Sequence, residues 1–309
     1  MNQIEELIDS FVEHLRLLTC SKRTIKNHRW SLDKFLAFLR SAKVTAIHDI
    51  TRDHIIDYQR YRHYYQNRFH THDSAFTQNR HLISVKQFFR YLKEEGFLAH
   101  DPTHDIHYAK EPRQLPKTAL TNTEIKKLLR RIDTSTLLGF RDRTIFELLY
   151  STGIRRNELL NLTVSDIDYE EGFLRVNHGK GDKDRVTPIG KIACQYLETY
   201  IKGIRPLLLK EKDEQALFLS QRKQKLTDIG LQRIIRHYAD VSKLNKHITT
   251  HTFRRSCATE MIRRNANLMH VKELLGHSSI DTVQTYCNLA ITDLKEAHRK
   301  CHPRERDTE

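Results

Sequence analysis

The first hundred residues of this chain contain almost nothing that interrupts a helix. From Met1 to Asp101 there is no proline and one glycine, Gly96. Glycine and proline are the strongest breakers of regular structure, so helical spacing of apolar residues continues through this stretch. We predict four helices here, the second capped by Ser21, the third following Thr51 and the fourth ending at Gly96. The apolar stripes of the first, second and fourth are Ile4, Leu7, Ile8, Phe11 and Leu15, then Leu32, Phe35, Leu36 and Leu39, then Leu82, Val85, Phe89 and Leu92.

Two basic ridges lie on these expected helices, away from the apolar stripes. They are Lys86, Arg90 and Lys93 on the fourth helix, and Lys22, Arg23 and Lys26 at the start of the second. Such ridges can follow a phosphate backbone, because phosphate contacts need only positive charge and reach. An ordinary solvated helix face explains each ridge equally well when it is taken alone.

A change in composition near residue 100 marks a domain boundary. Three prolines (Pro102, Pro112 and Pro116) arrive with basic residues and few apolar ones. This composition predicts an extended linker over 102–120, between an N-terminal domain over 1–101 and a second domain over 121–298, with a charged tail over 299–309. Thr121, followed by Glu124 three residues later, is typical of a helix start.

The second domain is expected to be helical around one β-hairpin. Residues 173–176 and 185–189 flank a glycine-rich polar turn, so they predict paired strands with Lys180 near the tip. Helices are expected over about 139–151, 157–161, 192–204, 228–242 and 250–264, the last ending near Asn265. The turn around Lys180 lacks the spacing of a Walker phosphate loop, so it implies no ATP. The fold class is mainly α with a small β-hairpin or sheet, in which a four-helix domain precedes an α+β domain.

The charge balance favours a polyanionic partner. The chain has 309 residues, a formal net charge of +14 and a pI near 9.5, and nucleic acid is the polyanion that such a surface most often meets. A solvated basic surface without a partner is the plainer interpretation. Five scattered cysteines, no signal peptide and no apolar run of membrane-spanning length predict a soluble, cytoplasmic protein without disulfides or membrane contacts.

Four polar residues between His247 and Tyr286 occur in an order that suits phosphate chemistry. His251 and Arg254 are three residues apart on an expected helix, so they share a face and can reach one anion. His277 follows the helix-stopping Gly276, and Tyr286 comes nine residues later. A tyrosine is a poor nucleophile until its proton is removed and the charge on its target is neutralised, and these neighbours supply both functions.

Two further segments contribute candidates from the expected second domain. Arg155 follows Gly153-Ile154, and Glu158 lies one helical turn later, where its carboxylate can hold the guanidinium; a plain surface ion pair is an equal alternative. Lys180 is the third cation, on the hairpin. Arg156 and Arg255 adjoin the two arginines, so a shift by one residue is conceivable, and His277 is also compatible with a simple helix cap.

The ordered set Arg155, Lys180, His251, Arg254, His277 and Tyr286 resembles that of the tyrosine recombinase (phage integrase) family. The resemblance extends from about Leu120 to Leu294, and the two-domain length looks most like the Xer-type or small plasmid and transposon recombinases. It implies a helical, SAM-like core-binding domain followed by a catalytic domain. Glu260 and Lys272, at positions where the family often has His and Gln, and Cys287-Asn288 after the tyrosine are departures from its pattern.

The resemblance also implies a reaction and its partners. Tyr286 is expected to attack a DNA phosphate and form a 3′-phosphotyrosine link, while Arg155 and Arg254 neutralise the phosphate oxygens, Lys180 protonates the 5′ oxygen, His251 exchanges a proton with the tyrosine and His277 donates a hydrogen bond. The two arginines replace a metal, so neither metal nor cofactor is expected. Double-stranded DNA is the expected partner, bound by a homotetramer or by a heterotetramer with a related recombinase, with or without an accessory protein.

Two other functions remain compatible with the sequence. A type IB topoisomerase shares much of this residue set but relaxes one duplex as a monomer, and a DNA-binding regulator that has lost catalysis would keep the basic surface. Retention of the complete set argues against the regulator. The DNA site, and the choice between integration, excision, inversion and chromosome dimer resolution, are not encoded in any pattern that we recognise.

Overall fold

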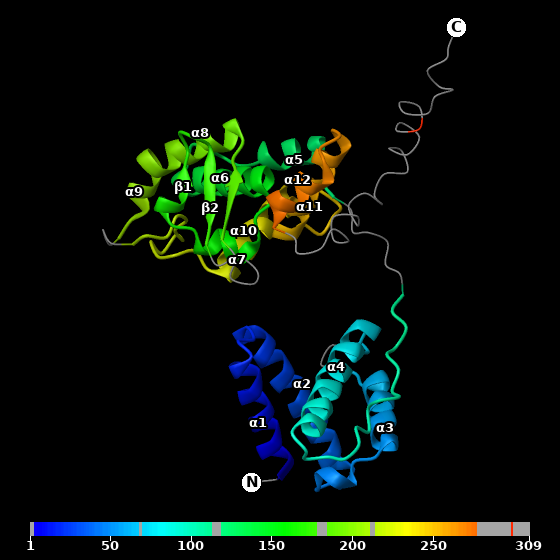
Figure 1. The fold of residues 1–309 in the computed structure, drawn as a ribbon. Helices are drawn as coiled ribbons and strands as arrows, with labels where there is room; N and C mark the ends of the chain where they lie inside the picture. The colour runs from blue at the N-terminus through cyan, green and yellow to red at the C-terminus, as the bar shows by residue number, and fades with distance from the viewer. Residues whose placement is uncertain are drawn as a thin grey trace. The chain divides into compact units, whose positions relative to one another are not determined.

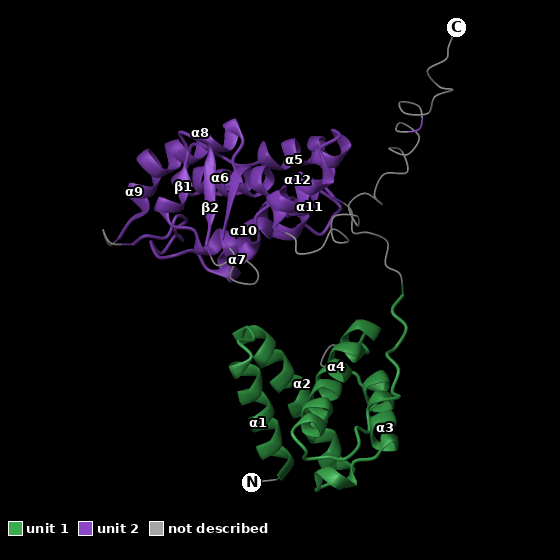
Figure 2. Cartoon of the chain, in the orientation of Figure 1, with its two compact units in different colours: residues 1–114 green, residues 115–309 purple. Residues whose placement is uncertain are grey.

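The computed structural model describes residues 3–67, 70–112, 119–177, 184–210, 214–276 and residue 298. The chain divides into two compact units, Met1–Gln114 and Leu115–Glu309 (Figure 2). Within the described ranges, no helix combines the length and the hydropathy needed to cross a membrane.

The described part of the first unit is a bundle of α-helices with one short 3-10 turn (Figure 1). Its elements are α1 (Gln3–Leu17), α2 (Lys22–Ser41), η1 (Ile47–Asp49), α3 (Arg52–Tyr64) and α4 (Ala75–Glu94). The Ser21 side chain caps α2 by accepting the Thr24 N–H at 3.1 Å, and Gly96, with φ of 76°, follows the end of α4. The four predicted helices and their stop signals are therefore confirmed. Their apolar stripes meet in one core around fully buried Phe35 and Phe89.

The chain stays attached to the first unit beyond residue 101. Ile106 is buried in the core of this unit. Asn79 on α4 donates a hydrogen bond to the Ala109 carbonyl at 2.9 Å and accepts the Ala109 N–H at 2.8 Å, while Gln59 on α3 donates to the His107 carbonyl at 2.8 Å. The segment expected to be an extended linker over 102–120 therefore begins as a strap bound to α3 and α4.

The second unit surrounds α6 (Leu137–Thr152), a helix buried on most sides. The other helical elements are α5 (Asn122–Leu129), α7 (Arg156–Asn161), η2 (Val164–Asp166), α8 (Lys191–Thr199), η3 (Tyr200–Ile204), α9 (Arg205–Leu208), α10 (Asp228–Val241), α11 (Thr250–Arg263) and α12 (Leu268–Leu275). The expected helix over 192–204 is longer than predicted: η3 is a π-helical turn, and the helix continues to Leu208. Packing of α6 against α8 and α11 forms the centre of this core.

A small antiparallel sheet covers one side of the second unit. Its strands, in the order β1 (Ile167–Asp168), β2 (Phe173–Val176) and β3 (Arg185–Pro188), include the predicted hairpin. The register pairs Leu174 with Thr187 and Val176 with Arg185. Because paired residues point to the same face, Arg185 shares the inner face with buried Val176 and Leu174. The mainly α fold with a small sheet is thus the one predicted.

Candidate active site

Arg155 is positioned by two local signals. Gly153 adopts the left-handed conformation that ends α6, with φ of 59°, and Arg155 then occupies the cap position of α7 in an extended conformation. The Glu158 carboxylate reaches back to accept the Arg155 backbone N–H at 2.7 Å. The same carboxylate accepts a hydrogen bond from Arg155 Nη1 at 2.8 Å, so the contact expected between these two side chains is present.

Arg254 is held by the packing of α11 on α6. Thr249 caps α11 by accepting the Thr252 N–H, and the Phe253 ring stacks on Phe146 of α6 with ring centroids 5.1 Å apart. One turn of α11 thereby carries the Arg254 side chain into the interior, where the residue is 3% exposed. Its Nη1 donates to the Gly153 carbonyl at 2.7 Å.

The two arginines converge on the C-terminal end of α12. Arg254 Nη2 donates to the Leu275 carbonyl at 2.5 Å, and Arg155 Nη2 donates to the Gly276 carbonyl at 2.5 Å. The last carbonyls of a helix have no partner within the helix, and positive charge is favourable there. Two guanidiniums from distant segments therefore meet at consecutive peptide groups, directly before His277.

Arg185 shares the Glu158 carboxylate with Arg155. Its Nη1 and Nη2 donate to Oε1 and Oε2 of Glu158, both at 2.9 Å. Burial tends to raise the pKa of Glu158, but hydrogen bonds from Arg185 and Arg155 outweigh burial and lower the pKa to about 2. Sequence reasoning missed Arg185. The available signal was strand alternation, which places this arginine on the inner face of the hairpin.

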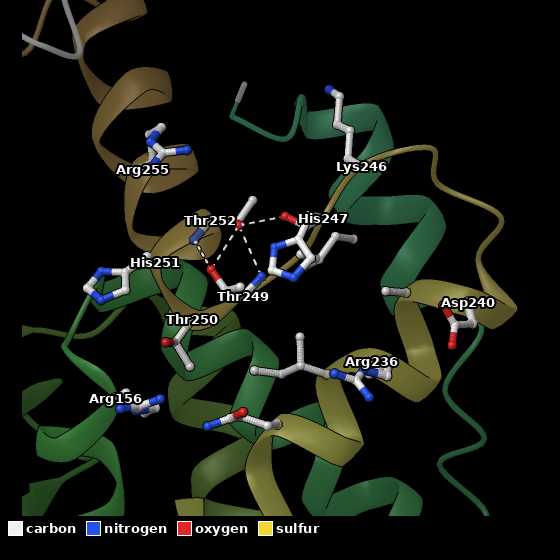
Figure 3. A pocket seen from close by; sticks show the side chains of 14 residues that line it. Arg156, Arg236, Asp240, Lys246, His247, Thr249, Thr250, His251, Thr252 and Arg255 are labelled. Carbon is white, nitrogen blue, oxygen red and sulfur yellow. Dashed lines mark hydrogen bonds between the residues drawn. The ribbon is translucent and has the colours of Figure 1, made fainter. Parts of the chain in front are cut away.

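His251 differs from Arg254 in exposure, although both belong to α11. The His251 side chain is exposed at the edge of a cavity of about 930 Å³, whose lining also includes Arg156, Arg236 and Arg255 (Figure 3). Partial burial of the imidazole, and then the positive charges of neighbouring arginines, lower its pKa below the ordinary value of 6.5. His251 is therefore neutral at neutral pH and able to accept a proton.

The alternative arginines lie differently from the two chosen. Arg156 forms an ion pair with Asp228 at 3.1 Å and, like Arg255, faces the cavity of Figure 3. The end of α12, by contrast, receives its hydrogen bonds from Arg155 and Arg254. Arg155 and Arg254 are therefore the two arginines that donate to the Gly276 and Leu275 carbonyls.

Three candidates lie outside the described residues, namely Lys180, His277 and Tyr286. Their expected roles stay predictions. In the described ranges there is no group of three or more His, Cys, Asp or Glu side chains that could hold a metal ion.

Comparison with known proteins decides the family. The model of the phage integrase family matches residues 118–292, and the model of the phage integrase N-terminal SAM-like domain matches residues 8–96. The chain belongs to the phage integrase family. It is similar to the tyrosine recombinase XerD of Listeria monocytogenes, with 36% identity over 97% of this chain and 100% of the relative. It is also similar to the tyrosine recombinase XerC of Oceanobacillus iheyensis, with 35% identity over 98% of each chain.

Solved structures of Xer recombinases agree with the assignment of this chain to the Xer-type tyrosine recombinases. The crystal structure of XerA recombinase covers 97% of the chain at 28% identity, with 99% of its own chain covered and a TM-score of 0.54. A XerH site-specific recombinase bound to palindromic difH substrate has a TM-score of 0.72 at 23% identity, over 94% of this chain and 83% of that one, which shows the shared fold. The predicted family and its two-domain architecture are confirmed.

Proposed function

We propose that this Xer-type recombinase cuts and rejoins double-stranded DNA at specific sites through a covalent 3′-phosphotyrosine at Tyr286. The observation that carries the proposal is the convergence of Arg155 and Arg254 on the Leu275 and Gly276 carbonyls. The two guanidiniums meet at Leu275 and Gly276, directly before His277, and together they form a site for one phosphate group. The XerH structures with difH substrate and the lambda integrase dimer bound to a core site support duplex DNA as the substrate.

The reaction follows from the chemistry of a phosphodiester. The Tyr286 oxygen forms a bond to phosphorus while the bond to the 5′ oxygen breaks, and Arg155 and Arg254 neutralise the non-bridging oxygens. His251 takes the phenolic proton, Lys180 gives a proton to the departing 5′ oxygen, and His277 donates a hydrogen bond to the phosphate. The phosphotyrosine keeps the ester energy, so a 5′-hydroxyl from another strand reverses the step without ATP.

The first unit supplies a second basic surface for the same duplex. Lys22, Arg23 and Lys26 are exposed near the start of α2, and Arg90 and Lys93 are exposed on α4. Lys86 lies with its ammonium 5.2 Å from the centre of the Tyr108 ring, so it contacts the strap that leaves this unit. We assign these residues to non-specific phosphate contacts, which weaken as salt concentration rises.

Assembly and location complete the proposal. The chain acts on chromosomal DNA in the cytoplasm, as a homotetramer on two sites or as a heterotetramer with a related recombinase, and chromosome dimer resolution fits its Xer relatives. Integration and excision use the same chemistry. A type IB topoisomerase activity or a regulator without catalysis receives no support from the relatives.

A covalent-capture experiment tests the function and identifies the target sequence at the same time. Wild-type protein is incubated with a library of randomised duplexes nicked near the centre, and DNA that stays attached to protein in detergent is sequenced. We expect a defined recovered sequence, and no adduct with Tyr286→Phe, which should still bind that sequence in gel shifts. An adduct that persists in Tyr286→Phe, or none with wild type on the native target, contradicts the proposal.

A further inference from the structure

The carboxylate of Glu158 is shared evenly between two arginines. Its Oε1 accepts Arg155 Nη1 at 2.8 Å and Arg185 Nη1 at 2.9 Å. Its Oε2 accepts the Arg155 backbone N–H at 2.7 Å and Arg185 Nη2 at 2.9 Å. Four donors fix the carboxylate plane, and the Glu158 side chain is 5% exposed. A bidentate arginine–carboxylate pair of this kind fixes the orientation of both side chains as well as bringing their charges together.

We propose that Arg185 is a positioning residue for DNA cleavage, which keeps the Arg155 guanidinium aimed at the scissile phosphate and keeps its charge available. This inference rests on the proposed function and deepens it. Arg185 is not itself placed on the substrate; it acts through Glu158.

The charge balance gives the first reason. Glu158 paired with Arg155 alone would form a neutral ion pair, and that pair would offer a phosphate little net attraction. With Arg185 present, two guanidiniums share one carboxylate, so the three groups together carry one positive charge. In a partly dry site this difference acts with little screening.

The close contact with Gly276 gives the second reason. A Cβ atom at Gly276 would lie 3.0 Å from both Cζ and Nε of Arg185. The same residue, Gly276, offers its carbonyl to Arg155. Arg185 therefore packs against Gly276, whose carbonyl accepts the hydrogen bond from Arg155. This contact links the start of β3 to the end of α12.

The position of Arg185 in the sequence gives the third reason. It is the first residue of β3 and follows Lys180 by five residues. Its pairing with Val176 places it at the loop end of the β2–β3 ladder. One side chain thus connects the strand that follows the Lys180 segment, the carboxylate behind Arg155, and the helix end before His277.

A purely structural ion pair at the loop end of the hairpin is the competing explanation, and a charge-specific measurement separates the two. The probe is the duplex recovered with wild-type protein, with either a normal or a methylphosphonate group at the scissile position. Methylphosphonate lacks the negative charge, so cleavage of that probe depends less on Arg155. A defect that arises through Arg155 should shrink on this probe, whereas a defect in folding should not.

The variants are Arg185→Gln and Arg185→Lys, with Arg175→Gln as the matched control. Arg175 is an exposed arginine on β2 of the same hairpin. For Arg185→Gln we expect the single-turnover cleavage rate to fall about 100-fold, which is the cost of an ångström-scale misplacement of a catalytic group. Arg185→Lys keeps the charge but loses the fork, so we expect an intermediate rate. Gel-shift affinity should change little, and Arg175→Gln should cleave like wild type.

Three results would overturn the inference. They are a wild-type cleavage rate in Arg185→Gln, an equal defect on the normal and methylphosphonate probes, or a loss of folding by thermal melting in both Arg185 variants. Cleavage by wild type and its loss in Tyr286→Phe are measured first and test the proposed function. The Arg185 variants are compared with wild type only after that, so a failure of this inference is distinguished from a failure of the proposed function.

Discussion

Arg254 and Leu275 are joined by a 2.5 Å hydrogen bond from the guanidinium Nη2 to the backbone carbonyl, across 21 positions of the chain. The side chain that we assign to phosphate charge thus also closes the C-terminal end of α12. The cation that we propose for phosphate binding and the cap of this helix are the same group.

Arg254→Ala should therefore have two separable effects. Loss of a guanidinium that stabilises transition-state charge should lower the cleavage rate by about 10²- to 10³-fold. Loss of the cap should increase amide hydrogen exchange across α12, measured by mass spectrometry on peptides covering 268–276. The control is Arg263→Ala, which changes an exposed arginine in the last turn of α11, the helix that carries Arg254. Unchanged exchange in α12 would contradict the capping role.

Gly276→Ala should destabilise the protein at a position where glycine is required. Gly276 has φ of 61°, and an added Cβ would meet the Arg185 guanidinium at 3.0 Å. We expect a loss of about 1–2 kcal/mol in the free energy of unfolding, from the left-handed backbone alone, and slower cleavage. Gly203→Ala is the matched control, because a Cβ there meets nothing within 4 Å. Denaturant titration compares them, and equal stabilities would refute the steric argument.

Lys180→Ala should be rescued chemically if this lysine protonates the 5′ oxygen. A duplex with sulfur in place of the 5′ bridging oxygen has a leaving group that needs no proton. We expect the variant to cleave the normal duplex about 10²- to 10⁴-fold more slowly than wild type, the usual contribution of a general acid. On the sulfur duplex the two proteins should have similar rates. A defect of the same size on both duplexes would assign Lys180 another role.

The pH dependence of cleavage should report His251 as a base. Partial burial and the nearby arginines lower its pKa below 6.5. The active form is neutral, so single-turnover cleavage should rise with pH through that lowered pKa and then level off. Arg156→Gln removes one of the charges that lower the pKa, so the rising limb should shift to higher pH. Arg263→Gln should leave it in place. A profile without this limb would argue against His251 as the proton acceptor.

Acid should weaken the ion pairs of Glu158 with Arg155 and Arg185. The folded pKa of Glu158 is lowered to about 2 from the ordinary 4.5. The ionised Glu158 carboxylate therefore contributes its full share to the free energy of unfolding above pH 4.5, and this share is lost as pH falls from 4.5 toward 2. The linkage corresponds to about 3 kcal/mol at neutral pH. Comparing wild type with Glu158→Gln by denaturant titration, we expect the stability difference to narrow between pH 5 and 3, and a constant difference would contradict the shift.

Local sequence determined most of the secondary structure of the described residues. The absence of proline and the single glycine before residue 101 predicted the helices of the first unit, because a helix continues unless its own backbone is interrupted. Gly153, Asn265 and Gly276 all adopt the left-handed conformation expected where a helix ends. The contact between Arg155 and Glu158 was predictable too, since one helical turn separates them. The family was recognisable from the order of six residues alone.

Tertiary structure decided which groups meet around the expected phosphate site. Arg155 reaches Gly276 across 121 positions, and Arg254 reaches Gly153 across 101. These contacts depend on the packing of α6, α11 and α12, and no periodicity within a short window encodes them. The role of Arg185 was hidden for the same reason. Residue type and spacing fix local backbone geometry, whereas the direction of a buried side chain depends on every element packed around it.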